Sequence, residues 1–350
     1  DHTKVDQYTF RGEQFDRGLA FVQFPEGLGG LGLSSRKMQT VVDSELRSAG
    51  VPYHDLIINP IGIGMGGPVV LTYASEEQKK RLLRPMFTGE EIWCQMFSEP
   101  GAGSDVAGLA SRAIRDGDEW IVNGQKVWTS YADKADWIFA LIRTDKEAPK
   151  HKGISFLLFD MDGGGVTTRP IKLISGASPF CETFFDDVKV PKKQIVGEVN
   201  KGWDVAKYLL THEREMISNS GSSRGAARSI GKVLADAGNG EMDTSLRAEA
   251  IATDIEEMAV ELTIERYKDQ AADGQGVGDA SAMLKYAGTE LNKRKHELFM
   301  SAGGSTALEW DGATGSLPAD WLRTKANSIE GGTSEVMLSI LSKRVLGLPG

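Results

Sequence analysis

Hydrophobic residues change their spacing twice along the chain, which divides it into three zones. In the first zone, an apolar stripe at helical spacing runs through Met38, Val41, Val42 and Leu46. Gly50 ends this segment, and a glycine at that point is typical of a helix terminus. Ser75 and Gln78 have the sequence of a capping box in front of a further apolar stretch. Residues 1–92 are therefore predicted to form a helical N-terminal domain.

The second zone, residues 93–202, consists of short β-branched and aromatic runs separated by Gly and Pro. These runs cover 120–122, 125–128, 138–142, 154–159, 166–171 and 182–190. Asn123-Gly124 lies between the first two runs and predicts a two-residue hairpin turn there. The zone is predicted to be a middle antiparallel β domain, either a small sandwich or a barrel.

The third zone, residues 203–350, returns to helical spacing. One stripe contains Ala206, Leu210, Glu213 and Ile217, and a second contains Ile251, Ile255, Met258 and Leu262. Such stripes are typical of helices that pack in a bundle. The order of helices, strands and helices predicts an α+β protein with a C-terminal helical bundle.

Composition narrows the possible partners. The 350 residues are 40% hydrophobic and 25% charged, with a net charge of −9, which argues against nucleic acid or an anionic membrane surface as a partner. The sequence contains no apolar run of the ~20 residues that cross a bilayer, and it does not show the basic-then-apolar pattern of a signal peptide. Cys94 and Cys181 have no partner motif, which favours a reducing, cytoplasmic location and indicates no metal site. Because the chain opens at Asp1 in polar sequence, we expect an N-terminal segment to be missing.

Two motif matches are weak. Residues 27–32 match the dinucleotide fingerprint literally, but no strand–helix–strand unit surrounds them, so a structural glycine turn is favoured. His212-Glu213-Arg214-Glu215-Met216 lacks the second His of a zinc-protease helix. Glu213 nevertheless interrupts an apolar stripe, where desolvation would raise the pKa of a carboxyl towards that of a useful base. The alternative is a structural glutamate paired with an arginine.

Three further segments have the composition of ligand-binding loops. Residues 97–105, Phe-Ser-Glu-Pro-Gly-Ala-Gly-Ser-Asp, would let backbone N–H groups approach a ligand, or would form a tight surface turn. Trp128-Thr129-Ser130 places an aromatic face beside two hydroxyls, which suits a planar heterocycle, although a core Trp is more common. Residues 330–335, Glu-Gly-Gly-Thr-Ser-Glu, precede an apolar helix and either receive an anion or simply cap the helix.

Taken together and in order, these segments resemble the acyl-CoA dehydrogenase family over nearly the whole chain. The resemblance rests on 98–105, on Asn123-Gly124-Gln125-Lys126-Val127-Trp128-Thr129-Ser130, on 184–188 with Pro191, on Glu213-Arg214, and on 331–335. It implies a C-terminal four-helix bundle (203–350) after the helical (1–92) and β (93–202) domains, with FAD bound between the domains.

The resemblance also implies roles for individual residues. Those assigned to the cofactor are Gln95, Phe97, Ser98, Ser104, Trp128, Thr129, Ser130, Gly332, Thr333 and Glu335. Those assigned to the acyl-CoA substrate are Ser104, Thr211, Arg214 and Gly331, with Glu213 and Arg214 catalytic. The thioester carbonyl would be polarised by the Gly331 N–H and a ribityl hydroxyl of FAD, so that a carboxylate can remove the α proton. The β hydrogen would leave as hydride to the flavin.

The chain departs from the family pattern at two places. Many members carry the catalytic glutamate in the loop before the last helix, where this chain has Gly331, with Glu330 one residue earlier. Members without it use a glutamate before an arginine on the bundle helix, the place of Glu213. The family's Arg-x-x-Phe-Gly element has no match near Arg266, and its Gln-x-x-Gly-Gly-x-Gly element is reduced to residues 300–305.

This pattern is similar to that of heteromeric bacterial members with large and small subunits, such as pimeloyl-CoA dehydrogenases. A second acyl-CoA dehydrogenase-like subunit, in a heterotetramer, would then supply the arginine for the FAD diphosphate, a homo-oligomer being the alternative. The expected activity is oxidation of an acyl-CoA to its trans-2-enoyl-CoA, with electrons passing to an electron-transfer flavoprotein. Alternative hypotheses are a flavin oxidase or monooxygenase on the same fold, and a non-catalytic assembly subunit.

Overall fold

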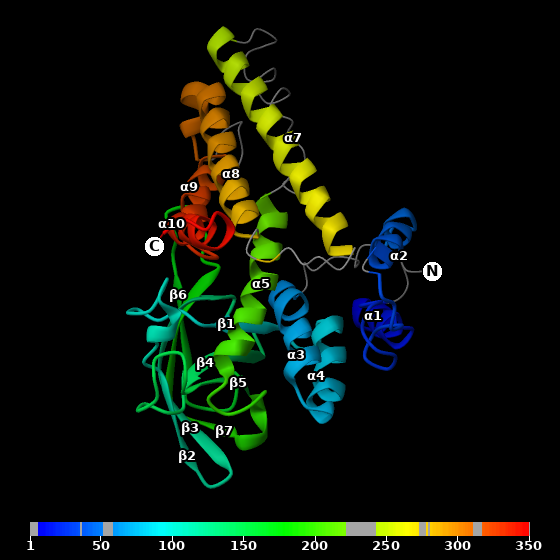
Figure 1. Cartoon of the computed structure of the whole chain (residues 1–350), viewed down its shortest axis with the longest axis vertical. Coiled ribbons are helices and arrows are strands. Elements are labelled where there is room, and N and C mark those ends of the chain that lie inside the picture. Colours follow the sequence, from blue (N-terminus) through cyan, green and yellow to red (C-terminus); the bar gives the residue numbers. More distant parts are fainter. Residues whose placement is uncertain are drawn as a thin grey trace. The chain divides into compact units, whose positions relative to one another are not determined.

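The computed structural model describes residues 6–35, 37–51, 59–221, 243–272, 278, 281–310 and 317–349 (Figure 1). The chain divides into two compact units. The first comprises residues up to Ile171 together with Ser178–His212, and the second comprises Lys172–Ala177 together with Glu213–Gly350. The first unit contains the N-terminal helices and the β-sheet.

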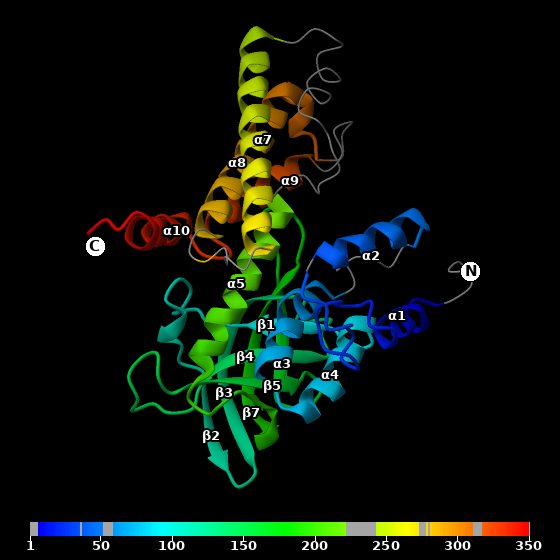
Figure 2. The ribbon, with the colours of Figure 1, turned by 45° about the vertical axis from the view of Figure 1, so that its right-hand side comes forward.

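The N-terminal helices are α1 (Gln7–Asp16), α2 (Lys37–Ser48), α3 (Gly67–Tyr73) and α4 (Glu76–Thr88), and a π-helical turn at Gly62–Gly66 leads into α3. The predicted capping box starts α4: Ser75 Oγ accepts from the Gln78 N–H, and the Gln78 side chain accepts from the Ser75 N–H. The Gln78 amide also donates to the carbonyls of Lys193 and Ile195. One residue therefore both caps the helix and attaches it to the segment that enters β8 (Ile195–Val196). Figure 2 shows α3 and α4 beside the strands of the β domain.

The β domain is an eight-stranded sheet. Its strands are β1 (Trp93–Met96), β2 (Arg112–Asp116), β3 (Glu119–Ser130), β4 (Trp137–Arg143), β5 (Ile154–Asp160), β6 (Val166–Ile171), β7 (Phe180–Pro191) and β8 (Ile195–Val196). The order is β6-β7-β3-β2-β4-β5-β8, and β1 pairs with β4. The pairings are antiparallel as predicted, except that β1 and β2 each run parallel to β4.

The predicted hairpin at Asn123-Gly124 is wrong. Residues 119–130 form one strand, and the chain reverses earlier, at Gly117-Asp118 between β2 and β3. The Asn123 amide instead pairs with Asp187 across the sheet, at 2.8 Å and 3.0 Å. Gly124 has a φ of 153° and lies so near Ser111 that a Cβ would come within 2.3 Å of Ser111 Oγ. The dipeptide therefore forms a register irregularity inside a long strand, because its glycine is needed for a close approach and not for a turn.

One continuous hydrophobic core lies in the sheet. It combines residues from β1, β3, β4, β5 and β7, among them Val122, Ile138, Leu157 and Val188, none more than 1% exposed. Cys94 and Cys181 both belong to this core as free thiols, and burial raises the pKa of the Cys94 thiol. The apolar residues of this core are thus covered within the chain.

The helical region begins with α5 (Gly202–Gly221), which runs from the first unit into the second. The second unit also contains α7 (Thr244–Ala272), α8 (Ser281–Gly303), α9 (Leu317–Thr324) and α10 (Ser334–Ile340). Helix α8 packs against α7, α9 and α10 (Figure 1). A C-terminal helical domain is thereby confirmed.

The two predicted stripes differ in outcome. On α5, Ala206 is fully buried while Leu210 and Glu213 are half-buried, and the side chain of Ile217 lies outside the described residues. On α7 the prediction of an inward stripe is wrong, since its four members are 51–64% exposed: Ile251, Ile255, Met258 and Leu262. Helix α7 packs on α8 through Val260 and Ile264 instead, which contact Leu291. Helical spacing identifies an apolar face but does not say which neighbour covers it.

Candidate active site

The first part of the site is the end of β1 and the loop that follows. Gln95 and Ser98 are half-buried, Phe97 is buried, and Ser104 is exposed at the far end of the loop. A two-way backbone bridge between Glu99 and Ala102, at 3.0 Å in each direction, closes the turn at Pro100-Gly101. The loop is therefore an ordered turn.

The second part is the end of β3, where a register shift against β7 follows Lys126. Within this bulge Trp128 has a φ of 60°, a left-handed conformation that a bulky residue adopts at a cost, and its indole is 54% exposed. The Trp128 ring meets Phe180 edge-on, with centroids 6.1 Å apart. The strain turns a large aromatic face outward beside Ser130, which is half-buried.

Thr129 points the other way. Its hydroxyl is fully buried, donates to the Cys181 carbonyl at 2.8 Å and lies 2.8 Å from Thr183 Oγ1. Only the backbone of Thr129 is left to face a cofactor, so the side-chain contact implied for it would require rearrangement of this buried pair.

The two parts are brought together by one backbone hydrogen bond, from Val127 N–H to the Ser98 carbonyl at 3.0 Å. The structure thus joins Ser98 with the Trp128–Ser130 segment, although at least 29 residues lie between them in sequence. Neither the Ser98 nor the Ser130 hydroxyl has a hydrogen-bond partner among the described residues. An exposed ring and two available hydroxyls are what a planar, polar ligand would need at this place.

A charged pair, Lys126 and Glu99, lies beneath these residues, and no sequence motif had indicated a role for it. Lys126 Nζ is fully buried and lies 2.7 Å from Glu99 Oε1. Burial lowers the pKa of Lys126 to about 8, and the nearby carboxylate opposes this shift. Burial also opposes ionisation of Glu99, but the attraction of Lys126 and the hydrogen bonds from Ala110 and Ser111 outweigh it and lower the pKa of that carboxyl. At neutral pH both groups are therefore charged. The signal in the sequence was a lysine in phase with the inward Trp120 and Val122.

Helix α5 carries the next group of predicted residues. Thr211 is exposed, and its hydroxyl donates to the Lys207 carbonyl at 3.1 Å. Glu213 is half-buried one turn after Leu209, which is fully buried. The side chain of Arg214 lies outside the described residues.

The final loop and α10 contain the remaining residues. Gly331 and Gly332 have φ values of 63° and 99°, and a Cβ on Gly332 would come within 2.5 Å of Met337 Cε. Thr333 caps α10 by accepting from the Val336 N–H at 3.2 Å, and Glu335 is exposed.

Glu330, the alternative base, is held by other groups in the second unit. Arg323 donates to its two oxygens at 3.1 Å and 2.8 Å, and the Asn327 amide donates at 2.7 Å. These three hydrogen bonds engage both carboxylate oxygens and hold the side chain in place. The local geometry therefore disfavours Glu330 as the base.

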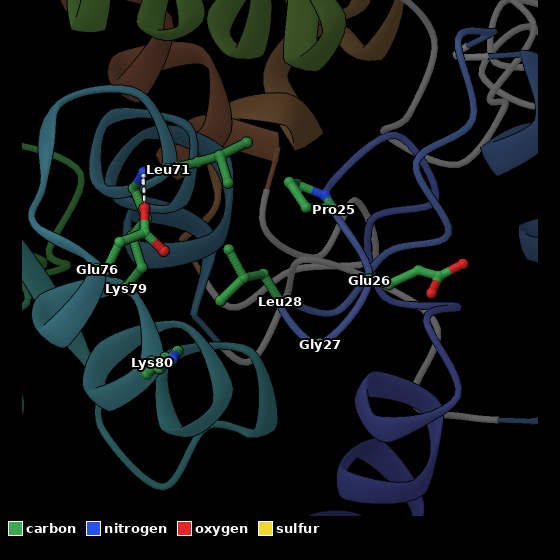
Figure 3. Close-up of a pocket in the computed structure, with 8 residues that line it drawn as sticks. All are labelled: Pro25, Glu26, Gly27, Leu28, Leu71, Glu76, Lys79 and Lys80. Atoms are coloured by element: carbon green, nitrogen blue, oxygen red, sulfur yellow. Dashed lines mark hydrogen bonds and ion pairs between the residues drawn. The ribbon is translucent and has the colours of Figure 1, made fainter.

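A cleft of about 340 Å³ lies elsewhere in the first unit, between the Pro25–Leu28 turn and helices α3 and α4 (Figure 3). Leu28 and Leu71 line it, and Lys79 at its wall is paired with Glu76 at 2.8 Å. No predicted site residue lines it. Among the described residues, no cluster of three His, Cys, Asp or Glu could hold a metal, and no helix is long and apolar enough to cross a membrane.

Comparison with known proteins places all three zones in one family. The acyl-CoA dehydrogenase N-terminal, middle and C-terminal domain models match residues 4–90, 94–188 and 200–346. Acyl-CoA dehydrogenase FadE34 of Mycobacterium tuberculosis is 36% identical over 95% of this chain, which spans 45% of that protein. Acyl-CoA dehydrogenase IpdE1 of the same species is 34% identical over 95% of this chain and 85% of its own length.

Solved structures show the same relationship. The Tcur3481-Tcur3483 steroid ACAD superposes with a TM-score of 0.81 at 27% identity, covering 98% of this chain and 88% of that one. The ChsE4-ChsE5 complex from Mycobacterium tuberculosis gives a TM-score of 0.74 at 25% identity, covering 100% and 91%. Each of these names joins two components, Tcur3481 with Tcur3483 and ChsE4 with ChsE5.

Proposed function

Because the chain belongs to the acyl-CoA dehydrogenase family, we propose that it catalyses FAD-dependent α,β-dehydrogenation of an acyl-CoA to the trans-2-enoyl-CoA. An electron-transfer flavoprotein would accept the electrons. The observation that carries the proposal is the Val127–Ser98 hydrogen bond, which joins the exposed Trp128 face to two available hydroxyls.

The residues of the first unit fit an isoalloxazine ring. Trp128 would lie against the ring, the Ser98 and Ser130 hydroxyls would donate to or accept from its polar edges, and Gln95 and Phe97 would complete the wall. When bound, FAD supplies the hydride acceptor. The contribution of the protein is to hold the ring and to exclude water from it. In the second unit, Gly332, Thr333 and Glu335 are assigned to the same cofactor.

The base is proposed to be Glu213. It removes the α proton, while the Gly331 N–H donates to the thioester carbonyl and makes that proton more acidic. Half-burial of Glu213 supports this role, and the three donors around Glu330 weaken the competing assignment. Thr211, Arg214 and Ser104 are assigned to the coenzyme A thioester.

A second acyl-CoA dehydrogenase-like subunit is proposed as the partner. The family's arginine element near Arg266 is absent, and the guanidinium of Arg266 lies 5.3 Å from the centroid of Tyr267. The exposed apolar face of α7 supports an assembly, since four large side chains in a row are costly in water. Relatives described as two-component proteins make a heteromer the preferred form over a homo-oligomer.

The acyl group is proposed to be bulky. This rests on the similarity to proteins described as a steroid ACAD, together with the resemblance to pimeloyl-type enzymes. The test is an anaerobic screen in which the protein, with any co-purifying subunit, is mixed with acyl-CoAs of increasing size, including steroid-derived ones, while flavin absorbance is followed.

Bleaching of the flavin absorbance by one substrate class, and reoxidation by electron-transfer flavoprotein, is the expected result. Rapid aerobic turnover without an added acceptor would favour a flavin oxidase instead. A colourless protein that no acyl-CoA affects, even with its partner bound, would make it a non-catalytic subunit. Tight FAD retention by a homo-oligomer without any partner would remove the heteromer from the proposal.

A further inference from the structure

The ammonium group of Lys126 occupies a gap in the sheet. On one edge of β4, β1 pairs as far as Ala140 and β2 pairs at Arg143, so neither strand faces Leu141 there. Lys126 reaches this gap from β3 and donates to the Leu141 carbonyl at 2.8 Å. It also donates to the Phe97 carbonyl at 3.2 Å, one residue after β1 ends. A side chain thus holds the backbone where the strand ladder stops.

Glu99 extends this connection to the next strand. It receives Lys126 Nζ at 2.7 Å, the Ala110 N–H at 2.6 Å and the Ser111 N–H at 3.0 Å, immediately before β2 begins. Glu99 is 7% exposed and Lys126 is not exposed at all. Each proton of the ammonium group therefore has a buried acceptor, and both carboxylate oxygens have buried donors.

We propose that Lys126 and Glu99 are positioning residues for the flavin site: they fix Phe97–Ser98 against Val127–Trp128. This inference rests on the proposed function for the identity of the ligand. Lys126 precedes Val127, whose N–H binds Ser98, and Glu99 follows Ser98 directly. Both segments that meet at the Val127–Ser98 bond are thus attached to the same buried charge pair.

A purely stabilising role is the weaker explanation. Buried ion pairs contribute little net stability, because desolvation offsets their attraction, and apolar residues often replace them at no loss. Their advantage is geometric, since directional bonds to two carbonyls and two N–H groups permit one arrangement of the loop. The bulge that turns Trp128 outward begins directly after Lys126.

The test compares Lys126→Met with Lys150→Met. Met is similar in length to Lys but cannot donate. Lys150 pairs with Asp105 on the same loop, yet the two side chains are 50% and 62% exposed, so loss of that pair should change little. Amide hydrogen exchange is measured over residues 97–105 and 127–130, with β5 as the internal reference, and FAD affinity is measured by fluorescence titration of the partner-bound protein.

In Lys126→Met we expect exchange in both segments to accelerate by about tenfold or more and FAD affinity to fall by roughly tenfold, since two carbonyls lose a buried donor. In Lys150→Met both should stay near wild type. Unchanged exchange in Lys126→Met would overturn the positioning role. Faster exchange with unchanged FAD affinity would show that the pair positions these segments but that the segments do not bind FAD. The proposed function, and not the positioning role, would then have failed.

Should Lys126→Met fail to fold, the double variant Lys126→Met/Glu99→Leu removes both charges together. Loose segments and weak FAD binding in a double variant of restored stability would support the inference. Wild-type exchange and FAD affinity in that variant would overturn it, because an apolar pair would then serve equally well.

Discussion

The β domain and helix α7 differ in how far their apolar residues are exposed to solvent. In the sheet, the runs that the sequence marks as strands are buried in one core, with Ile138, Leu157 and Val188 at 1% exposure or less. On α7 a stripe of comparable apolar character is more than half exposed, from Ile251 to Leu262. The two regions belong to the same chain and to the same family match.

The difference in exposure indicates which neighbours cover the apolar side chains of each region. A strand between two others has its neighbours fixed by backbone hydrogen bonds, and in this sheet the side chains of several strands meet in one shared core. A helix satisfies its own backbone and can take a neighbour from another molecule. We therefore interpret the core of the sheet as covered within the chain, and the exposed face of α7 as a surface to which the proposed subunit binds.

The largest effect is expected in the helical region, at Glu213. Glu213→Gln keeps the size and hydrogen-bonding capacity of the side chain but cannot accept the α proton. Flavin reduction in rapid mixing should slow by roughly 10²–10⁴-fold, while FAD and ligand binding stay near wild type. Glu330→Gln is the matched control. An inactive Glu330 variant beside an active Glu213 variant would show that the alignment of the final loop is wrong.

Truncating one apolar residue in each region should affect the free energy of unfolding very differently. Leu157→Ala, in the sheet core, should lower the free energy of unfolding by about 2–5 kcal/mol. Ile255→Ala, at 64% exposure on α7, should change it by no more than about 0.5 kcal/mol in the isolated chain. Chemical denaturation measures both. A large loss from Ile255→Ala without any partner present would mean that α7 is covered within the chain.

A smaller effect is expected from Glu99, and it depends on pH. The pKa of this carboxyl lies below its ordinary value of 4.5 in the folded protein, so its stabilisation is complete above pH 4.5 and is lost as the pH falls through the folded pKa. Glu99→Gln should lower the free energy of unfolding by about 1–3 kcal/mol at pH 7. The difference in unfolding free energy between wild type and variant, measured by urea titration, should become smaller below pH 4.5. A difference that widened in acid would contradict this sign.

The smallest effect is expected from the two hydroxyls beside Trp128. Ser98→Ala or Ser130→Ala should weaken flavin binding by on the order of 1 kcal/mol per lost hydrogen bond, and should shift the flavin absorbance. Neither should alter the unfolding of the apoprotein, since neither hydroxyl has a partner among the described residues. Unchanged affinity, spectrum and turnover in both variants would place this motif away from the cofactor.

The sequence predicted local structure well where a short run of residues favours a single conformation. The Ser75–Gln78 capping box was recognisable because its two hydrogen bonds close within four residues. The run 166–171 was recognisable as a strand from its β-branched residues, and it matches β6. Asn123-Gly124 misled because the same dipeptide serves a turn or a close approach, and only the position of Ser111 decides between them.

For the site, the sequence by itself determined the family, because its motifs are contiguous, and it named the residues that we propose to bind a flavin. Only the tertiary structure decided that Thr129 faces inward, that Glu330 is occupied by Arg323 and Asn327, and that Lys126 lies beneath the Ser98 loop. These facts depend on contacts between segments distant along the chain, where burial and donor geometry, and not spacing, select the partner. Only the tertiary structure likewise shows that the α7 stripe is exposed, because helical spacing defines an apolar face but not the neighbour that covers it.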